Sequence, residues 1–172
     1  VEAGVTQVQG TVNGYGERCG NANLCSIVPI LQMKLGYRCV PPQSLKTLTE
    51  VSHFVAEVCN MQADDHQPFV GSSAFAHKGG VHINAMLKNP RTYEHVVPSE
   101  VGNKTRLLIG ELGGKAAVQA SARSYKLDSD DKEQESRFLE EVRSREAQGY
   151  HYEMAPGSYE LLMRRHYKKR FK

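Results

Sequence analysis

A glycine-rich stretch near the start of the chain carries the side chains best suited to chemistry. Residues 10–24 read Gly-Thr-Val-Asn-Gly-Tyr-Gly-Glu-Arg-Cys-Gly-Asn-Ala-Asn-Leu, which places a carboxylate (Glu17), a guanidinium (Arg18) and an amide (Asn21) on one short turn. Glycines let the backbone bend sharply, so such a turn can bring polar side chains close to a small ligand. Two simpler interpretations stay open, with Asn21 as a helix N-cap and Glu17 with Arg18 as an ion pair. Because the turn comes so early in the chain, we expect the complete site to need residues from elsewhere.

Three histidines, His77, His82 and His95, lie farther along among glycines and small residues. An imidazole exchanges a proton near neutral pH and is therefore a common acid–base group. Small residues and glycines around histidines, as in residues 70–95, are typical of a surface that closes on a ligand or on another chain. A histidine beside an apolar helix is also explained by packing or by a structural hydrogen bond, and for His77 both interpretations stay open.

The composition is that of an ordinary globular protein. Of the 172 residues, 40% are hydrophobic and 24% are charged. No run of about 18 apolar residues, the length that a membrane span needs, is present. The net charge of +3 is too small to indicate nucleic-acid binding, although basic residues crowd the end from Arg164 to Lys172. We interpret that end as a solvated helix terminus, with an anionic partner as the alternative, and expect neither nucleic acid nor membrane as partners.

The four cysteines, Cys19, Cys25, Cys39 and Cys59, are spaced neither as zinc ligands nor as a redox pair. The chain starts with Val1, and we expect it to carry no secretory signal. We therefore expect reduced, mostly buried thiols in a cytoplasmic protein.

Hydrophobic periodicity predicts the elements that hold these groups in the first part of the chain. Residues 4–12 are rich in β-branched side chains and predict a strand. A helix from the N-cap Asn21 to Leu35 follows, stopped by a glycine and kinked by Pro29. Residues 43–60 predict an amphipathic helix. Its expected apolar stripe consists of Leu45, Leu48, Val51, Val55 and Val58.

The second part of the chain predicts short helices joined by turns. Residues 81–87 suggest a helix that Asn89-Pro90 ends. A helix of modest quality opens around residues 111–115, and residues 128–131 indicate a linker that ends in an N-cap aspartate. Further helices are predicted over 130–147 and 158–167, with Pro156-Gly157 as a turn between them.

Several stretches together resemble one family. The pattern Gly10-Thr11-x-Asn13-Gly14-x-Gly16-Glu17-Arg18-x-Gly20-Asn21-Ala22 is similar to the last-strand signature of the 2-isopropylmalate, homocitrate and citramalate synthases. Residues 68–82 resemble the histidine segment that follows the barrel in this family. Residues 89–95, 101–103 and 111–115 agree with it in order, so the resemblance covers nearly the whole chain.

The resemblance implies an α/β fold, in which the C-terminal strand-helix piece of a TIM barrel is followed by mainly helical linker subdomains. The implied domains are residues 1–62 for the end of the catalytic barrel, 63–125 for the linker subdomain and 126–172 for a small helical subdomain. Most of the barrel and a C-terminal regulatory domain would lie outside this chain. A strand and helix without the rest of a barrel leave apolar faces uncovered, so we expect residues 1–36 to be poorly supported or paired with another chain.

The family's reaction, which the resemblance brings with it, condenses acetyl-CoA as cosubstrate with a 2-keto acid and then hydrolyses the thioester. By resemblance, Asn21 is a ligand of a divalent metal (Mg²⁺, Mn²⁺ or Zn²⁺), and Glu17 is a carboxylate that orients or helps a catalytic histidine. His82 and Tyr93 match the catalytic pair that the linker supplies. In the family this pair reaches into the neighbouring subunit's barrel, so a homodimer with a shared active site is implied.

Two details favour the branch of the family that takes pyruvate and forms citramalate in isoleucine biosynthesis. One is the proline inside the helix in residues 20–29, and the other is the pattern of residues 149–165. The 2-isopropylmalate and homocitrate branches stay open, because the keto-acid pocket lies mainly outside this chain. The alternative of another class is a non-catalytic dimerisation or interaction fragment. We expect the chain alone to be inactive, since it holds too few metal ligands.

Overall fold

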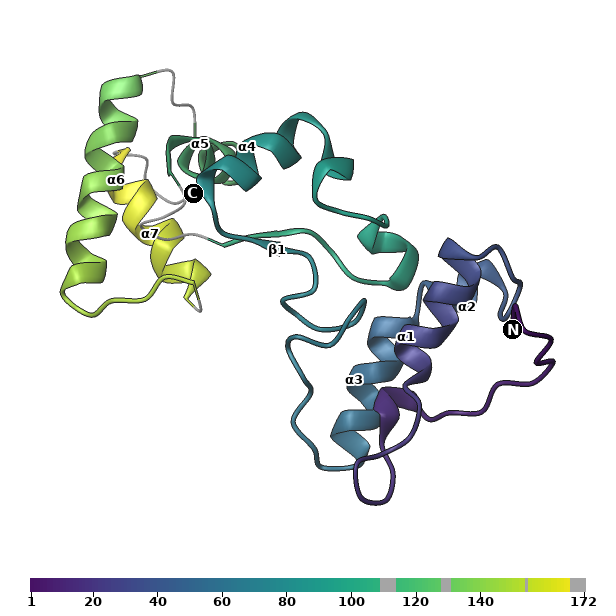
Figure 1. Ribbon diagram of the computed structural model, residues 1–172. Coiled ribbons are helices and arrows are strands. Elements are labelled where there is room, and N and C mark those ends of the chain that lie inside the picture. The colour runs from purple at the N-terminus through teal and green to yellow at the C-terminus, as the bar shows by residue number, and fades with distance from the viewer. Residues whose placement is uncertain (109–113, 128–130, 154, 168–172) are drawn as a thin grey trace. The chain divides into compact units, whose positions relative to one another are not determined.

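The computed structural model describes residues 1–108, 114–127, 131–153 and 155–167, and the chain divides into two compact units (Figure 1). The first unit comprises residues 1–75 and 94–105, and the second comprises residues 76–93 and 106–172. The chain therefore leaves the first unit after Phe75, returns at Glu94 and leaves again after Thr105. The domain boundaries expected after residues 62 and 125 stay predictions.

The first unit is built from short helical elements around a small apolar core. Its elements are η1 (Val12–Gly14), α1 (Leu24–Pro29), the π turn η2 (Ile30–Lys34), α2 (Pro42–Leu45), α3 (Leu48–Val58) and η4 (Pro98–Val101). The turn η1 contacts both α1 and α3, so the start of the glycine-rich stretch lies against both helices. The buried members of the core are Cys25, Leu45, Phe69, Val70, Phe75, Val96 and Val101.

The predicted strand over residues 4–12 is wrong. Residues 1–9 are exposed, and the described part of the chain gives this segment one β contact, a single parallel bridge between Thr11 and Asn23. A strand needs a neighbouring backbone along its length to pair its N–H and C=O groups. The β-branched composition favours an extended conformation, but it cannot supply that neighbour.

The helix predicted from Asn21 begins later and changes character at its proline. Asn23, not Asn21, caps α1, because the Asn23 side-chain oxygen accepts a hydrogen bond from the Cys25 N–H at 2.9 Å. Helix α1 ends at Pro29 and continues as the wider turn η2, as expected where a residue lacks the N–H that a helix needs. The predicted disturbance at Pro29 is confirmed, and the chain then turns at Gly36, whose φ is +77°.

The single helix predicted over residues 43–60 is two helices, α2 and α3. Between them the Thr47 hydroxyl and the Thr47 N–H both donate to the Ser44 carbonyl oxygen, at 2.9 and 3.2 Å. These bonds close a tight turn that interrupts the helical ladder. The turn also packs closely against Gly102, which follows η4. A Cβ at Gly102 would lie only 2.3 Å from the Lys46 carbonyl oxygen in the turn.

The buried face of α3 also differs from the predicted stripe. Ser52 and Ala56 are buried, whereas Val51, Phe54 and Val58 are exposed. The Ser52 hydroxyl donates a hydrogen bond to the first-unit residue Asn13, which turns this face of α3 inward. A polar contact across the unit therefore decided which face of the helix is covered.

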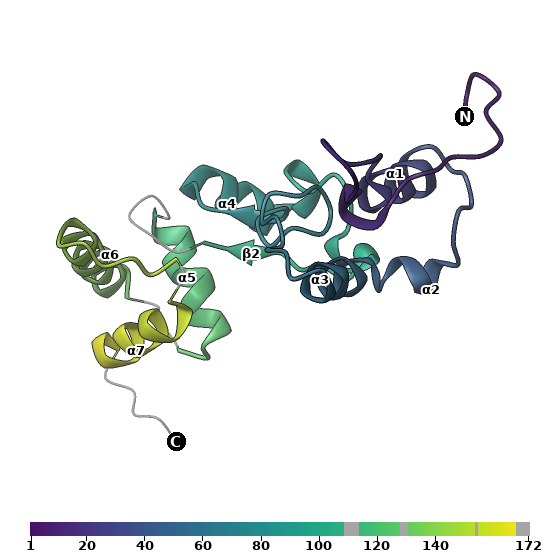
Figure 2. The same cartoon turned by 90° about the horizontal axis from the view of Figure 1, so that it is seen from below.

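The second unit joins a short pair of strands to a group of helices (Figures 1 and 2). Strand β1 (Ala76–His77) pairs in parallel with β2 (Arg106–Leu107), with His77 opposite Leu107. The helical elements are α4 (Gly80–Lys88), η3 (Pro90–Thr92), α5 (Gly114–Ser124), α6 (Lys132–Ala147) and α7 (Pro156–His166). The described fold therefore mixes α and β structure and is mainly helical, as the sequence predicts.

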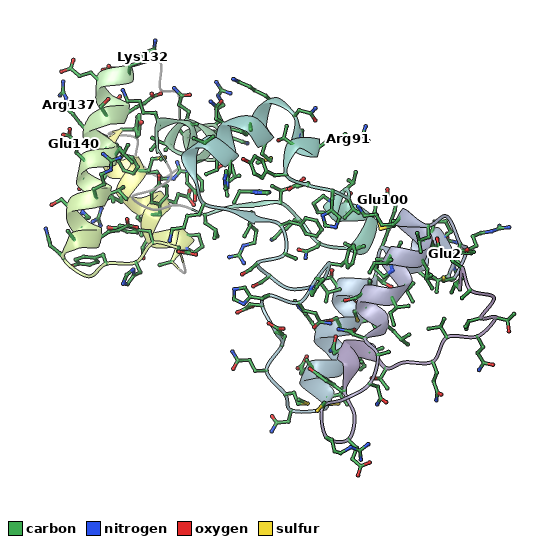
Figure 3. The ribbon with its side chains drawn as sticks, in the orientation of Figure 1. Glu2, Arg91, Glu100, Lys132, Arg137 and Glu140 are labelled. Carbon is green, nitrogen blue, oxygen red and sulfur yellow. The ribbon has the colours of Figure 1, made fainter. Side chains whose placement is uncertain are left out.

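Helices α5, α6 and α7 contribute to the larger core of this unit. Phe138 is fully buried and meets Tyr159 edge to face, with ring centroids 5.5 Å apart. The other buried members are Val118, Ala122, Leu127, Leu139, Val142, Tyr152, Leu162, Met163 and Tyr167. The outer side of α6 is charged, and Lys132, Arg137 and Glu140 project from it (Figure 3). The predicted solvated helix with one apolar stripe is thus confirmed.

The ends of these helices follow their sequence signals, with one exception. Asp131 caps α6 by accepting hydrogen bonds from two N–H groups of its first turn, and Gly149 beyond its end has a φ of +95°. The end of α4 at Asn89-Pro90 is also confirmed. Pro156-Gly157 was predicted as a turn and instead begins α7, because a proline in the first turn gives up an N–H that has no helical partner. The predictions for residues 111–113, 128–130 and 168–172 lie outside the described residues.

All four cysteines are free, and only Cys25 is buried. The expectation of mostly buried thiols is wrong, because Cys19, Cys39 and Cys59 lie outside the helix bodies and are exposed. Among the helices that the structure describes, none combines the length and the apolar composition that crossing a bilayer requires.

Candidate functional site

The glycine-rich stretch forms a loop, residues 10–24, whose two ends are tied together; we name it the glycine loop. The Thr11 N–H donates to the Ala22 carbonyl oxygen at 3.0 Å. Inside the loop, the Asn21 N–H donates to the Gly14 carbonyl oxygen at 2.8 Å. These bonds hold the polar residues of the loop on a defined backbone between η1 and the start of α1.

At two positions of this loop only glycine fits, because other atoms lie where a Cβ would be. A Cβ at Gly16 would lie 2.0 Å from the side-chain nitrogen of Asn21, and a Cβ at Gly20 would lie 2.2 Å from the Gly14 carbonyl oxygen. Gly20 also has a φ of +92°, a conformation that other residues rarely adopt. A larger residue at either position would displace the backbone or the amide of Asn21.

Asn21 is exposed on the glycine loop, with its amide held in one orientation. Its side-chain nitrogen donates to the Tyr15 carbonyl oxygen at 3.1 Å. Its side-chain oxygen accepts no hydrogen bond from the residues that the structure describes. Asn23 takes the cap position, so the N-cap interpretation of Asn21 is wrong. An exposed, unpaired amide oxygen fits one ligand position around a hard divalent cation.

The described residues do not complete such a metal site. Over residues 1–108, 114–127, 131–153 and 155–167, no three His, Cys, Asp or Glu side chains gather where they could hold an ion.

Glu17 and Arg18 form an ion pair on the same loop, with 3.0 Å between Glu17 Oε2 and Arg18 Nη1. The two side chains are 85% and 80% exposed. Exposed pairs of this kind contribute little to stability. The ion-pair interpretation is borne out as a contact, and the Glu17 carboxylate stays accessible to a ligand.

Asn13 connects the glycine loop to the rest of the first unit. Its φ is +61°, and its side-chain nitrogen donates to the Ser52 carbonyl oxygen at 2.8 Å. Its side-chain oxygen accepts hydrogen bonds from the Ser52 hydroxyl (2.6 Å), the Gln67 amide (3.3 Å) and the Cys25 thiol (3.5 Å). Burial raises the pKa of the Cys25 thiol, which therefore stays protonated as a donor. Sequence reasoning missed this cluster, although an Asn-Gly dipeptide is typical of positive φ.

The second unit brings His82 and Tyr93 together. His82 lies in the first turn of α4, and Tyr93 follows the turn η3, which packs back against α4. The Asn89 side chain accepts a hydrogen bond from the Arg91 N–H at 3.1 Å and so caps η3. The His82 and Tyr93 rings then lie 4.4 Å apart between centroids, tilted by 35°. The structure thus places these two site residues in contact, while their catalytic roles stay predictions.

His77 also contacts Tyr93. The two ring centroids are 6.2 Å apart and the ring planes meet at 66°, an edge-to-face arrangement. His77 is buried on β1, where its carbonyl oxygen accepts a hydrogen bond from the Leu108 N–H at 2.8 Å. Burial and ring packing favour a structural role for His77, in which it holds the Tyr93 ring from a fixed strand.

The third histidine belongs to the first unit. The His95 ring packs edge to face on Phe69 with centroids 5.7 Å apart, and the Lys34 ammonium donates to the His95 carbonyl oxygen at 3.2 Å. Burial, and then the positive charge of Lys34, lower the pKa of His95. His77, His82 and His95, the three histidines that the sequence analysis singled out, are therefore divided between the two units.

An ion pair joins two segments of the second unit that the sequence patterns singled out separately. Lys78 Nζ lies 2.8 Å from Glu153 Oε2, and the side chains are 43% and 36% exposed. Lys78 directly follows His77, and Glu153 lies between α6 and α7. The pair ties that connection to the histidine segment, although its exposure keeps its contribution to stability modest.

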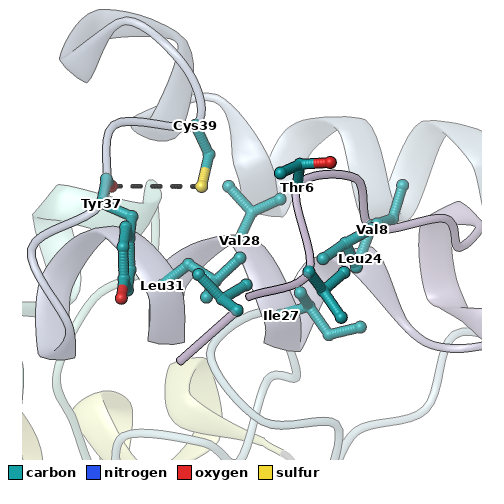
Figure 4. A pocket seen from close by; sticks show the side chains of 10 residues that line it. Thr6, Val8, Leu24, Ile27, Val28, Leu31, Tyr37 and Cys39 are labelled. Atoms are coloured by element: carbon teal, nitrogen blue, oxygen red, sulfur yellow. Dashed lines mark hydrogen bonds between the residues drawn. The ribbon is translucent and has the colours of Figure 1, made fainter. Parts of the chain in front are cut away.

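The first unit contains an apolar pocket of ≈ 290 Å³ between the N-terminal segment and α1 (Figure 4). Its lining residues are Val1, Val5, Thr6, Val8, Leu24, Ile27, Val28, Leu31, Tyr37 and Cys39. The lining contains no Asp, Glu, Lys, Arg or His side chain. The pocket lies along α1, where Leu24, Ile27 and Val28 line it, and its lining does not include the polar residues Glu17, Arg18 and Asn21 of the glycine loop.

Residues 69–149 match the family described as homocitrate synthase post-HMGL domain-like. The chain is 50% identical over 165 residues to the (R)-citramalate synthase of Synechocystis sp. (95% of this chain, 30% of the relative). It is 48% identical over 168 residues to the (R)-citramalate synthase of Aquifex aeolicus (97% and 32%). The 2-isopropylmalate synthase of Aliivibrio salmonicida is 40% identical over 139 residues (75% and 27%). The chain spans about a third of the length of the citramalate synthases it matches.

Proposed function

We propose, from the premise that the chain belongs to the family of 2-isopropylmalate, homocitrate and citramalate synthases, that it is part of an acyltransferase. The proposed reaction condenses acetyl-CoA with pyruvate to give citramalate, a step of isoleucine biosynthesis. The observation that carries the proposal is the contact between His82 and Tyr93, with 4.4 Å between ring centroids. The citramalate branch is supported by identities of 50% and 48% to two citramalate synthases, against 40% to a 2-isopropylmalate synthase.

In this proposal the glycine loop supplies part of a metal site. Asn21 contributes its exposed side-chain oxygen as one ligand of Mg²⁺, Mn²⁺ or Zn²⁺, and residues outside this chain contribute the others. A bound cation of this kind polarises the carbonyl group of a chelated keto acid. Glu17, exposed on the same loop, accepts a hydrogen bond from the catalytic imidazole and orients it. Residues 1–62 are then the last strand-helix piece of a TIM barrel, which accounts for the half-buried apolar side chains Leu24, Ile27 and Val28 along α1.

The pair of His82 and Tyr93 handles the protons of the condensation. The His82 imidazole removes a methyl proton from acetyl-CoA, and the enolate carbon forms a bond to the keto carbon of pyruvate, whose oxygen takes up a proton. The Tyr93 hydroxyl donates a hydrogen bond to the thioester oxygen while negative charge develops there. Water then cleaves the thioester to give citramalate and free CoA. The contact between the rings keeps the imidazole and the phenol in a fixed relation.

We further propose that the active enzyme is a homodimer. The pair of His82 and Tyr93 of one subunit then faces the glycine loop of the other. The division of these residues between two compact units of the chain is compatible with a site assembled from two copies.

A chimaera tests the catalytic part of the proposal. The part of this chain that aligns with the Synechocystis enzyme, 50% identical over 165 residues, replaces the matching segment of that enzyme. With acetyl-CoA, pyruvate and Mn²⁺ we expect the chimaera to release free CoA, and the chain alone to release none. A folded chimaera without activity would refute the proposal and favour a non-catalytic interaction fragment.

The keto acid needs a separate experiment, because the pocket that selects it is supplied mainly by residues outside this chain. In the complete gene product we expect CoA release to be faster with pyruvate than with 3-methyl-2-oxobutanoate, the keto acid that yields 2-isopropylmalate. The reverse preference would move the protein to the 2-isopropylmalate branch and leave the roles of His82 and Tyr93 unchanged.

A further inference from the structure

We propose that Asn13 is a positioning residue for the amide of Asn21, through which helix α3 sets the geometry of the metal-binding side of the glycine loop. The inference rests on the proposed function of Asn21 as a ligand. It goes beyond that function because it assigns the orientation of the Asn21 amide to the buried cluster around Asn13.

The anchor of this arrangement is the side chain of Asn13. Both ends of its amide are used, with the nitrogen on the Ser52 carbonyl oxygen and the oxygen on the Ser52 hydroxyl, the Gln67 amide and the Cys25 thiol. Ser52, Gln67 and Cys25 are 2%, 8% and 0% exposed, respectively. Removing the amide would leave buried polar groups without a partner, so the position of Asn13 is strongly determined.

The two residues directly after Asn13, Gly14 and Tyr15, accept the hydrogen bonds that orient Asn21. The Gly14 carbonyl oxygen accepts the Asn21 backbone N–H at 2.8 Å, and the Tyr15 carbonyl oxygen accepts the Asn21 side-chain amide at 3.1 Å. The Thr11 hydroxyl donates to the same Tyr15 carbonyl at 2.7 Å and fixes it further. Both hydrogen bonds that orient Asn21 therefore end on the two residues that Asn13 anchors.

A comparison within the first unit separates positioning from mere stability. Asn103 is also half-buried, and its side-chain nitrogen donates to the Phe69 and Gly71 carbonyl oxygens, at 3.0 Å each. It supports the same unit without a hydrogen bond to the glycine loop. Asn103→Ala is therefore a matched control, since it removes a comparable set of side-chain hydrogen bonds.

The deletion variant is Asn13→Gly, because glycine adopts the φ of +61° freely, whereas alanine would add strain. The first readout is amide hydrogen exchange by NMR on the full chain. We expect the Asn21 N–H to exchange about tenfold faster in Asn13→Gly, relative to the N–H of Cys59, which follows the end of α3 and donates to the Val55 carbonyl oxygen. In Asn103→Ala the two amides should change together. Asn60→Gly, which adds a glycine at an exposed residue with a φ of +52°, controls for backbone entropy and should leave the ratio unchanged.

The second readout is the Mn²⁺ concentration that half-activates the chimaera. We expect this concentration to rise by about 10–100-fold in Asn13→Gly, the usual effect of losing a residue that orients a metal ligand, and by much less in Asn103→Ala. If Asn13→Gly does not fold, Ser52→Ala is the milder variant. It removes the hydroxyl donor and keeps the carbonyl acceptor, so the same changes should occur at smaller size.

The outcomes separate the two levels of the proposal. If Asn21→Ala leaves the half-activating Mn²⁺ concentration unchanged, the ligand role of Asn21 is wrong. If Asn21→Ala raises it while neither Asn13→Gly nor Ser52→Ala exceeds Asn103→Ala in either readout, the ligand role stands and the positioning role of Asn13 is overturned. A selective increase in Asn21 exchange together with weaker Mn²⁺ activation supports the inference.

Discussion

Replacing Tyr93 by phenylalanine removes one oxygen atom and keeps the ring. The ring retains its contact with His82 at 4.4 Å and its edge-to-face contact with His77 at 6.2 Å. Tyr93 is 43% exposed, and its hydroxyl makes no hydrogen bond to the residues that the structure describes. The variant therefore leaves no buried group without a partner, and we expect the free energy of unfolding to change by less than about 0.5 kcal/mol.

The expected loss of activity is much larger. A group that handles a proton or holds developing charge in the transition state contributes about 10²–10⁴-fold in rate. At about 1.4 kcal/mol per factor of ten, this is about 3–5 kcal/mol of transition-state stabilisation. The loss of transition-state stabilisation should therefore be several times larger than the loss in the free energy of unfolding. A tyrosine with a merely structural role would not produce this difference.

The assay is release of free CoA by the chimaera at saturating acetyl-CoA and pyruvate, with chemical denaturation measured on the same samples. Tyr150→Phe is the matched control, because Tyr150 is 54% exposed, lies in the same unit and has no proposed role. His82→Ala should lose activity to a similar extent and in addition about 0.5–1.5 kcal/mol of stability from the aromatic pair. Turnover of Tyr93→Phe close to that of Tyr150→Phe would refute the assignment of Tyr93 to the chemistry.

Three further predictions concern the packing of residues inside each of the two units. Phe138→Ala should destabilise the second unit by about 3–5 kcal/mol, because its fully buried ring leaves a cavity, and thermal unfolding checks this. Gly20→Ala should cost the first unit about 1–3 kcal/mol in a denaturant titration, whereas Gly36→Ala should cost less, because a Cβ at Gly36 meets nothing within 4 Å and a Cβ at Gly20 meets a carbonyl oxygen at 2.2 Å. A thiol reagent at neutral pH should label the exposed Cys19, Cys39 and Cys59 in the folded chain and Cys25 only after denaturation, since burial raises the Cys25 pKa; rapid labelling of all four would contradict the buried cluster.

Local signals in the sequence predicted many of the elements in the second unit. Asp131 at the start of α6, Gly149 after its end and Asn89-Pro90 after α4 act on backbone groups within a few residues of themselves. Such signals do not depend on the rest of the fold, so the pattern was sufficient. The candidate pair of His82 and Tyr93 came from the resemblance to the family, whose motif is continuous along this stretch; the structure shows their contact, and their catalytic role stays a prediction.

The first unit shows where sequence reasoning failed. A strand over residues 4–12, a cap at Asn21 and a buried valine stripe on α3 were each reasonable as local propensities. The strand and the stripe were decided by partners elsewhere, namely the missing neighbour strand and the hydrogen bond from Ser52 to Asn13. The cap was decided locally, by the competing residue Asn23. The cluster around Asn13 could not be predicted, since its members come from separate elements.

The sequence by itself therefore determined several helix ends and the glycine-rich turn, and its resemblance to a family identified the candidate site residues. The tertiary structure decided which face of α3 is buried, and that His77 and His82 both contact Tyr93. The physical reason is range. A cap or a glycine stop is satisfied by its own neighbours in the chain, whereas burial and side-chain hydrogen bonding are satisfied only by residues that folding brings together.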